Sequence, residues 1–321
     1  MKITGKLLTL IFFIPITVLS QQKDTLLNQL GSPGIKADSL PNRINNNNNS
    51  VTYEDAKLDF KTYFFLLKDD FKKQVTSPFH TQKKDWLKVG GFALLTGAVA
   101  LTNSPITGFA NKLYNRNKTV ANISKYVTRF GGTYEVYAIA GFYAYGLIFK
   151  TQKEKTTTAL ATQAYVTAAV LSTFGKYLSG VQRPYYTDPN YNKKGPVFHG
   201  PFYPFIKGLD AQDYHSFPSG HTTAAFAAAT VYALEYKDKP FIPIVSYTAA
   251  TLIGLSRITE NKHWATDVLV GAMLGYLSGR QVVNNFHRYS MSKHAKETAG
   301  SFSFNLQYNN KQFLSGLTYT F

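Results

Sequence analysis

The chain of 321 residues is long enough to bury one large core or two small ones. Its 35 lysines and arginines against 18 aspartates and glutamates give a formal net charge of +17, which suits an anionic partner such as a phosphorylated substrate or an acidic lipid surface. The basic residues are scattered through loops instead of alternating with aromatics along one stripe, which argues against nucleic-acid binding. The chain has no cysteine, so disulfides, thiolate catalysis and cysteine-containing zinc sites are excluded.

The N-terminus has the pattern of an export signal. Two lysines precede an apolar run, residues 7–19, which is short for a membrane span, and Val18 and Ser20 are small enough for a cleavage site. We therefore predict a signal peptide over residues 1–20, with an uncleaved anchor as the alternative. The protein is expected to be exported to the cell envelope, where it is periplasmic or membrane-associated.

Two segments of different character follow the signal. Residues 21–52 are polar, contain an asparagine run and lack apolar periodicity, which predicts a disordered leader. Within residues 53–85, Leu58, Phe64 and Phe71 recur at helical spacing among lysines and aspartates, which predicts an amphipathic helix and a linker.

Residues 86–290 form the predicted helical domain, an all-α bundle of six helices. The helices are expected where stretches rich in Ala, Gly, Thr and Tyr occur, at 87–102, 135–149, 157–175, 222–236, 241–255 and 267–283. None of these stretches reaches about 20 uninterrupted strongly apolar residues, and several carry polar residues midway. Buried helices of a soluble domain and weak transmembrane helices both remain open.

The C-terminal residues 301–321 show strand periodicity. Phe302, Phe304 and Leu306 alternate with polar residues, a turn sequence follows at 309–311, and alternation resumes up to Phe321. This pattern predicts a β-hairpin, which we expect to pack on the bundle. The alternative is an envelope-association element, because a terminal Phe after alternating aromatics resembles the last strand of an outer-membrane barrel.

Three short motifs carry most of the functional information, because together they combine three permanent cations, two imidazoles and one carboxylate. They are Lys176-x6-Arg183-Pro184, Pro218-Ser219-Gly220-His221 and Ser256-Arg257-x5-His263-x3-Asp267. The first closes the third predicted helix, the second opens the fourth, and the third lies between the fifth and sixth. Up-and-down packing would bring all three to one end of the bundle, as a shared site requires.

The motifs suit the binding of a phosphoryl group. Lys176, Arg183 and Arg257 can stabilise charge on phosphoryl oxygens, and arginine adds bidentate geometry. Ser219 and Gly220 precede an Ala/Thr-rich helix whose N-terminus offers free N–H groups to an anion. Each fragment alone also fits a solvated surface or an ordinary helix start.

The histidines suit covalent catalysis. His263 and Asp267 are four residues apart, and a carboxylate that accepts from one ring nitrogen leaves the other free to attack. His221 would protonate the leaving oxygen. We expect three further histidines to have structural roles: His199, His215 and His287.

The set of motifs resembles the type 2 phosphatidic acid phosphatase and vanadium haloperoxidase superfamily over residues 134–283, with every signature position filled. The resemblance implies an all-α bundle and metal-independent hydrolysis without a cofactor through a phosphohistidine. It implies His263 as nucleophile, Asp267 as its orienting partner and His221 as acid. The remaining signature positions would surround the phosphate: Lys176, Arg183, Ser219, Gly220 and Arg257.

The leading hypothesis is a cell-envelope phosphatase acting on phosphate monoesters or pyrophosphates, with a phosphorylated lipid favoured over a small phosphate ester and with membrane association. Candidate substrates are phosphatidic acid, phosphatidylglycerol phosphate, undecaprenyl diphosphate and lipid A. A soluble periplasmic acid phosphatase is one alternative. A vanadate-dependent haloperoxidase would use the same motifs, and a non-catalytic envelope scaffold is the third alternative.

Overall fold

The computed structural model describes residues 58–80, 82–149, 151–187, 195–298, 301–309 and 312–320, so the predicted signal peptide and leader lie outside the described residues. All of them belong to the unit Val51–Phe321. They form α-helices, one 3₁₀ helix and two strands. The elements are α2 (Phe60–Thr76), η2 (Ser77–His80), α3 (Lys83–Ala100), α4 (Asn103–Arg116), α5 (Lys118–Phe130), α6 (Thr133–Ile148), α7 (Gln152–Ser179), α8 (Pro184–Thr187), α9 (Tyr203–Lys207), α10 (Ala211–Tyr214), α11 (Gly220–Glu235), α12 (Phe241–Thr259), α13 (Ala265–Thr298), β1 (Ser301–Asn309) and β2 (Gln312–Thr320).

The predicted all-α bundle is confirmed, but the predicted number of helices is wrong. Each of the six apolar stretches lies in a helix to within two residues at its ends (α3, α6, α7, α11, α12 and α13), and the amphipathic segment forms α2. The residues that the structure describes nevertheless form twelve α-helices, because the connections are helical as well. The side chain of Asn117, for example, accepts hydrogen bonds from the N–H groups of Thr119 and Val120 and so caps the start of α5.

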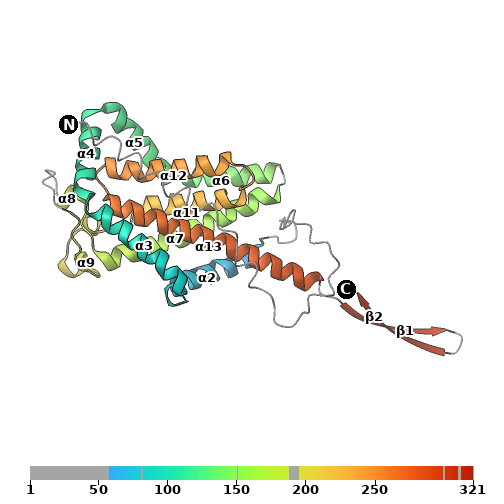
Figure 1. Cartoon of the computed structure of the whole chain (residues 1–321). Coiled ribbons are helices and arrows are strands. Elements are labelled where there is room, and N and C mark those ends of the chain that lie inside the picture. The colour runs from blue at the N-terminus through green and yellow to red at the C-terminus, as the bar shows by residue number, and fades with distance from the viewer. Residues whose placement is uncertain are drawn as a thin grey trace. The chain divides into compact units, whose positions relative to one another are not determined.

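Helices α7, α11, α12 and α13 lie side by side, with α11 in contact with the other three (Figure 1). The close approach of α11 and α13 depends on two glycines of α13. A Cβ at Gly275 would lie 2.2 Å from the carbonyl oxygen of Thr223, and one at Gly279 would lie 2.5 Å from that of Ala227. Larger side chains at these positions would push the two helices apart, and the motif-bearing start of α11 would move with them.

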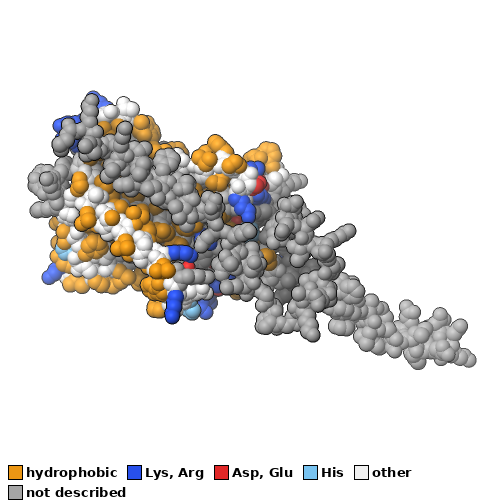
Figure 2. Space-filling view, viewed as in Figure 1, with side chains coloured by type: hydrophobic (Ala, Val, Ile, Leu, Met, Phe, Trp, Pro, Cys, Tyr) orange, Lys and Arg blue, Asp and Glu red, His pale blue; other side chains and the backbone are white. Residues whose placement is uncertain are grey.

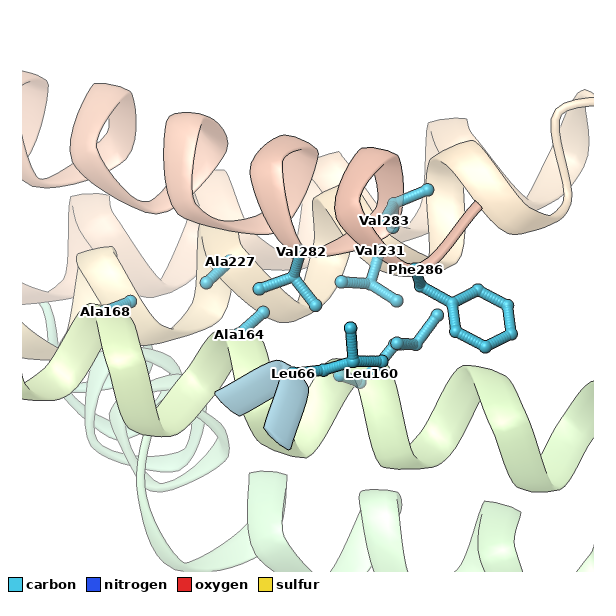
Figure 3. Packing of buried hydrophobic residues seen from close by; sticks show 10 residues of the cluster. Leu66, Leu160, Ala164, Ala168, Ala227, Val231, Val282, Val283 and Phe286 are labelled. Carbon is cyan, nitrogen blue, oxygen red and sulfur yellow. The ribbon is translucent and has the colours of Figure 1, made fainter. Parts of the chain in front are cut away.

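The main hydrophobic core joins α2, α7, α11 and α13. Leu66, Leu160, Val231, Val282 and Phe286 are all buried and pack together (Figure 3). Burial of each such side chain contributes roughly 1.5–3 kcal/mol to stability. The core therefore fixes the relative positions of α7, which carries Lys176, of α11, which carries His221, and of α13, which begins two residues after His263.

Beside this core lies a group of polar side chains that we call the α2 polar cluster: Asp69, Asp70, Lys73, Gln163 and Asn285. Asp70 is only 1% exposed, and its two carboxylate oxygens accept from the amides of Gln163 and Asn285. The Asn285 amide also donates to Asp69, 3.0 Å away, while Lys73 pairs with Asp69 and donates to the Asn285 oxygen, 2.6 Å away. Hydrogen bonds between polar groups thus hold α2 on α7 and α13.

Helix α4 also presents a polar face to the bundle. Its buried residues are Asn103, Thr107 and Asn111, while Phe109 and Leu113 are exposed. Asn103 donates to the Thr266 hydroxyl over 3.0 Å and accepts from the Thr266 N–H over 3.1 Å. This pair of hydrogen bonds ties α4 to the first turn of α13.

Strands β1 and β2 pair antiparallel, with Ser301 opposite Thr320 and Asn309 opposite Gln312. They occupy the residues for which alternation predicts a hairpin. The packing of this hairpin on the bundle stays a prediction.

Large apolar side chains are exposed on several helices of the bundle, and Figure 2 shows them across one face. Among the described residues, α12 is long and apolar enough to cross a membrane. The pair Asp85–Ala100 and Asn103–Arg116, bent by 57° at the break between α3 and α4, meets the same criterion when taken together.

Candidate active site

The three motifs meet at one end of the bundle, as the up-and-down order predicts. This is the end where α7 and α12 finish and where α11 and α13 begin (Figure 1). The N–H of Ser219 donates to the carbonyl oxygen of Asp267 over 3.0 Å, which joins the second motif directly to the third. The main chain therefore holds the two motif loops together independently of any ligand.

His263 is buried, with 2% of its surface exposed. Its Nδ1 lies 2.7 Å from the carbonyl oxygen of Ser216, whereas the nearest oxygen of Asp267 lies 3.5 Å from Nδ1. A carbonyl can only accept, so Nδ1 carries a proton. Burial and the nearby cations lower the pKa of His263 well below its usual value, so the ring is neutral and Nε2 carries the lone pair. The neutral tautomer required for attack through Nε2 is thus set by a main-chain carbonyl, with Asp267 as the more distant partner.

Asp267 has no exposed surface and anchors the motif loops. Its Oδ2 accepts from the N–H of Trp264 over 2.9 Å and from the hydroxyl of Ser216. Its Oδ1 is buried without a hydrogen-bond partner in the part of the chain that the structure describes. Burial raises the pKa of Asp267 to about 7, although the hydrogen bonds from Ser216 and Trp264 and the nearby cations oppose the rise. Asp267 therefore titrates near neutral pH.

His221 lies in the first turn of α11, against the glycine pair that follows α5. A Cβ at Gly131 would be 3.4 Å from the His221 Cβ, and one at Gly132 would be 3.6 Å from its Nε2. Burial, together with the charges of Arg257, Lys176 and Arg183, lowers the pKa of His221 to about 4. An anion among these cations would raise that pKa again, so the histidine would accept a proton most readily when phosphate is bound.

Lys176 faces the start of α11. Its Nζ lies 3.1 Å from the position that a Cβ would occupy at Gly220, so glycine leaves room for the ammonium group there. Burial lowers the pKa of Lys176 to about 8, and the charges of Arg183 and Arg257 act in the same direction. Mutual repulsion of this kind disfavours the empty site and favours an anion inside it.

Arg183 is held by main-chain carbonyls. Its Nε donates to the carbonyl oxygen of Gln212 over 2.7 Å, and one Nη donates to that of Lys262 over 3.5 Å. These contacts fix the guanidinium between the loop that precedes the second motif and the loop of the third. Lysine could not make the same two contacts from a planar group.

Arg257 is 7% exposed and is paired with a carboxylate. Its Nη1 donates to Glu260 Oε2 over 2.8 Å and lies 3.4 Å from Thr128 Oγ1. Its Nε is buried and, within the described ranges, has no hydrogen-bond partner. Arg257 therefore retains an unused donor at the end of the bundle where the other cations gather.

Ser219 and Gly220 differ in what they can offer an anion. The N–H of Ser219 is engaged with Asp267, and its hydroxyl lies 2.9 Å from that of Thr222. Gly220 and His221 belong to the first turn of α11, whose N–H groups have no partner within the helix. The main-chain donors for a phosphate are therefore expected from Gly220 and His221, while contact of Ser219 with phosphate stays a prediction.

The other histidines have aromatic or acidic neighbours. His287 Nε2 lies 2.9 Å from Glu235 Oε1, and the His199 ring stacks on Tyr203 at 4.2 Å. His215 packs against Tyr177 at 4.8 Å. Burial lowers the pKa of His215, and the charges of Lys176 and Arg183 lower it too, so this ring lies near the cations. Sequence reasoning assigns His215 no role in the reaction, although its spacing from His221 allows it to line the entrance to the site.

Sequence reasoning also misses three residues that position the predicted ones. Ser216 binds His263 and Asp267, Glu260 binds Arg257, and Thr128 donates to Glu260 over 2.8 Å. Ser216 acts partly through its carbonyl, which every residue has, so no residue pattern could reveal it. Glu260 lies inside the third motif, three residues after Arg257, and an i,i+3 charge pair is a signal that could have found it.

Chemically, the arrangement surrounds a neutral imidazole with three cations and places a second imidazole nearby. In the described part of the chain, no group of three or more histidines and carboxylates has the arrangement of a metal site. The site can accept a tetrahedral oxyanion and offer it one nucleophilic nitrogen.

Residues 157–291, which include all three motifs, match the model of the PAP2 superfamily, and this match supports the resemblance that the motifs carry. A 71-residue segment is 49% identical to the lipid A 1-phosphatase of Porphyromonas gingivalis and covers 22% of this chain and 16% of that protein. A 153-residue segment is 30% identical to the bacitracin transport permease protein BcrC of Bacillus licheniformis and covers 47% of this chain and 66% of that protein. The crystal structure of Aquifex aeolicus LpxE aligns with 57% of this chain and 94% of its own, at 23% identity and a TM-score of 0.40. The chain thus spans less than two thirds of the length of the lipid A 1-phosphatase and of BcrC.

Proposed function

We propose that the protein is a phosphatase that hydrolyses phosphate monoesters or pyrophosphates of a lipid through a phosphohistidine at His263. The observation that carries the proposal is the hydrogen bond from His263 Nδ1 to the Ser216 carbonyl, which leaves Nε2 unprotonated beside Lys176, Arg183 and Arg257. A neutral nucleophile next to three cations matches the needs of phosphoryl transfer, in which positioning and charge stabilisation dominate.

In the first step, His263 Nε2 forms a bond to phosphorus while the bond from phosphorus to the leaving oxygen breaks. His221 gives its proton to that oxygen, and the three cations stabilise the charge on the equatorial oxygens. In the second step, neutral His221 takes a proton from water, whose oxygen attacks phosphorus. The phosphorus–nitrogen bond breaks, inorganic phosphate leaves, and both histidines return to their starting states.

Three observations support a lipid substrate and a location at a membrane or in the envelope. Phe174 and Leu178, on either side of Lys176 in α7, expose 59% and 43% of their surfaces, so apolar contact area lies beside the site. The net charge of +17 favours anionic surfaces. The relative from P. gingivalis is named for a phosphatase of lipid A. Together they favour a phosphorylated lipid over a small phosphate ester.

The test is phosphate release by purified protein in excess chelator, with short-chain phosphatidic acid compared with a soluble aryl phosphate. We expect release from the lipid and loss of that release in His263→Ala. Equal release from both substrates would favour a soluble acid phosphatase instead. Absence of release from these two and from a lipid pyrophosphate would contradict the proposed function.

A further inference from the structure

The side chain of Arg257 is oriented by residues to which the phosphohistidine mechanism assigns no step. Its Nη1 donates to Glu260 Oε2 over 2.8 Å, and the two side chains are only 8% and 13% exposed. Pairs of charges this far from water are geometrically specific, because misaligned partners would each lose solvation without compensation. Glu260 thus fixes one corner of the guanidinium.

Thr128 fixes Glu260 in turn. Its hydroxyl donates to Glu260 Oε1 over 2.8 Å and lies 2.7 Å from the hydroxyl of Ser256. Thr128 comes from the last turn of α5, outside the segment 157–291 that matches the superfamily. The same end of α5 continues into the glycine pair against which His221 packs. The C-terminal end of α5 therefore lies against both Glu260, which orients the phosphate-binding Arg257, and the ring of His221, the proposed acid.

Two nitrogens of the Arg257 guanidinium differ in their hydrogen bonds. Nη1 is engaged with Glu260, whereas Nε is buried and, in the described part of the chain, lacks a hydrogen-bond partner. Guanidinium groups bind oxyanions best through two parallel N–H groups, so the Nε edge is the one left for a phosphoryl oxygen. Release of the Glu260 contact would let the group rotate away from that orientation.

We propose that Glu260 and Thr128 are positioning residues that hold the Nε edge of Arg257 toward the phosphoryl group in the transition state. This inference rests on the proposed function of the same site. The inference predicts a specific change in ligand affinities, because the Glu260 carboxylate has two opposing effects on an anion in the site. Its charge weakens the binding of any anion nearby, yet its hydrogen bond aligns the arginine for the geometry in which charge develops.

Loss of the carboxylate charge should therefore separate ground-state from transition-state binding. In Glu260→Gln, KM should stay the same or fall, while kcat falls about tenfold, the equivalent of one charge-assisted hydrogen bond. Inhibition by inorganic phosphate should be unchanged or stronger, and inhibition by vanadate, which adopts the transition-state geometry, should weaken about tenfold. A defect that only lowered the folded fraction would move kcat alone and neither inhibition constant.

Thr128 provides a conservative pair of variants. Thr128→Val keeps the shape but removes the donor to Glu260, so kcat and vanadate affinity should fall about threefold, as for a lost neutral hydrogen bond. Thr128→Ser retains the hydroxyl and should behave as wild type. The matched control is Glu235→Gln, which removes another buried glutamate charge, beside His287 and outside the motifs, and should leave the kinetics unchanged.

The experiment measures kcat and KM on phosphatidic acid and, separately, vanadate and phosphate binding by calorimetry on the full-length protein and each variant. The proposed split in Glu260→Gln, with Thr128→Ser unaffected, supports the inference. Wild-type kinetics and vanadate affinity in Glu260→Gln would overturn it even if the enzyme is an active phosphatase. Conversely, a wild type that binds vanadate but releases no phosphate would contradict the proposed function, while weaker vanadate binding in Glu260→Gln would still support the positioning role.

Discussion

The cations of the candidate active site and the α2 polar cluster are both groups of polar side chains within the helical bundle, but their charges are compensated differently. In the α2 polar cluster both oxygens of Asp70 accept amide hydrogen bonds, and Lys73 is paired with Asp69. At the active site, Lys176 lies close enough to two arginines that their charges lower its pKa, and the Nε of Arg257 has no partner among the described residues.

The difference distinguishes a scaffold from a ligand site. Burial of a charge is costly unless a partner compensates it, so a cluster whose charged groups all have hydrogen-bond partners destabilises the empty protein less than unpaired charges do. An excess of buried positive charge destabilises the empty protein and is relieved only when an anion binds. The two regions should therefore respond to mutation in opposite ways.

The largest expected effect is on the nucleophile. His263→Ala should lower kcat by at least about 1,000-fold, because the proposed covalent intermediate forms on the ring of His263. His287→Gln, which changes a histidine paired with Glu235, should leave kcat unchanged. Phosphate release under saturating substrate measures both. Residual activity of His263→Ala within tenfold of wild type would rule out the phosphohistidine route.

The second largest effect is expected from removal of the positive charge of Lys176. Lys176→Gln should lower kcat/KM about 100-fold, as expected for one group that stabilises transferring charge. It should also leave the thermal midpoint of the phosphate-free protein unchanged or raise it, because a repulsive buried charge disappears. Steady-state kinetics and thermal unfolding provide the two numbers. A clear drop in the thermal midpoint would show that Lys176 stabilises the phosphate-free protein, and it would contradict the proposed difference between the site and the α2 polar cluster.

The paired cluster should show the reverse. Asp70→Ala removes the acceptor of the Gln163 amide and one of the two acceptors of the Asn285 amide, and should cost about 2 kcal/mol of unfolding free energy. The kcat per folded molecule should be that of wild type. Denaturant unfolding and active-site titration test this pair of outcomes, and a selective loss of kcat at normal stability would contradict it.

The raised pKa of Asp70 should also make the unfolding free energy depend on pH. Burial raises its pKa to about 7 from an ordinary value of 3.8, against the opposing hydrogen bond from Asn285. The native state therefore binds this proton more tightly than the unfolded state does. Its contribution to stability is complete below the unfolded pKa and is lost as pH rises through about 7. Unfolding free energies from pH 4 to 8 should show this decline in wild type and a shallower one in Asp70→Ala; equal slopes would contradict the assignment.

The smallest effect is a shift in the pH dependence of activity. His221 must be protonated to act as the acid, and the pKa of His221 in the empty site is about 4 because of burial and of the neighbouring cations. Bound phosphate adds negative charge and raises that pKa, so activity should be lost at higher pH in kcat than in kcat/KM. Profiles from pH 4 to 9 test the shift. Coincident basic limbs would mean that the titrating acid does not feel the substrate.

The sequence predicts the site better than the helices around it. The convergence of the motifs follows from helix order alone, and their residue types predict an anion site. Helix α4 does not follow, because it buries Asn103, Thr107 and Asn111 and exposes apolar residues, so hydrophobic periodicity gives no sign of the face that packs. A helix with a polar inner face can be recognised only from its partners, here the start of α13.

The positioning contacts are likewise outside the reach of residue patterns. Spacing suggests that Asp267 sets the tautomer of His263, yet the Ser216 carbonyl is the nearer acceptor, at 2.7 Å against 3.5 Å. This contact depends on how the loop before the second motif folds back, which is a tertiary property. Thr128 is more than a hundred residues from Arg257 in the chain, and only the packing of α5 on α12 brings them together.

The central claim is a covalent bond between phosphorus and His263, and rapid quenching tests it most directly. Enzyme mixed with substrate labelled in the phosphoryl group should, when quenched within one turnover, carry acid-labile and base-stable label on the peptide that contains His263. His263→Ala should carry none. Full turnover without any labelled protein, or label on a different residue, would contradict the claim.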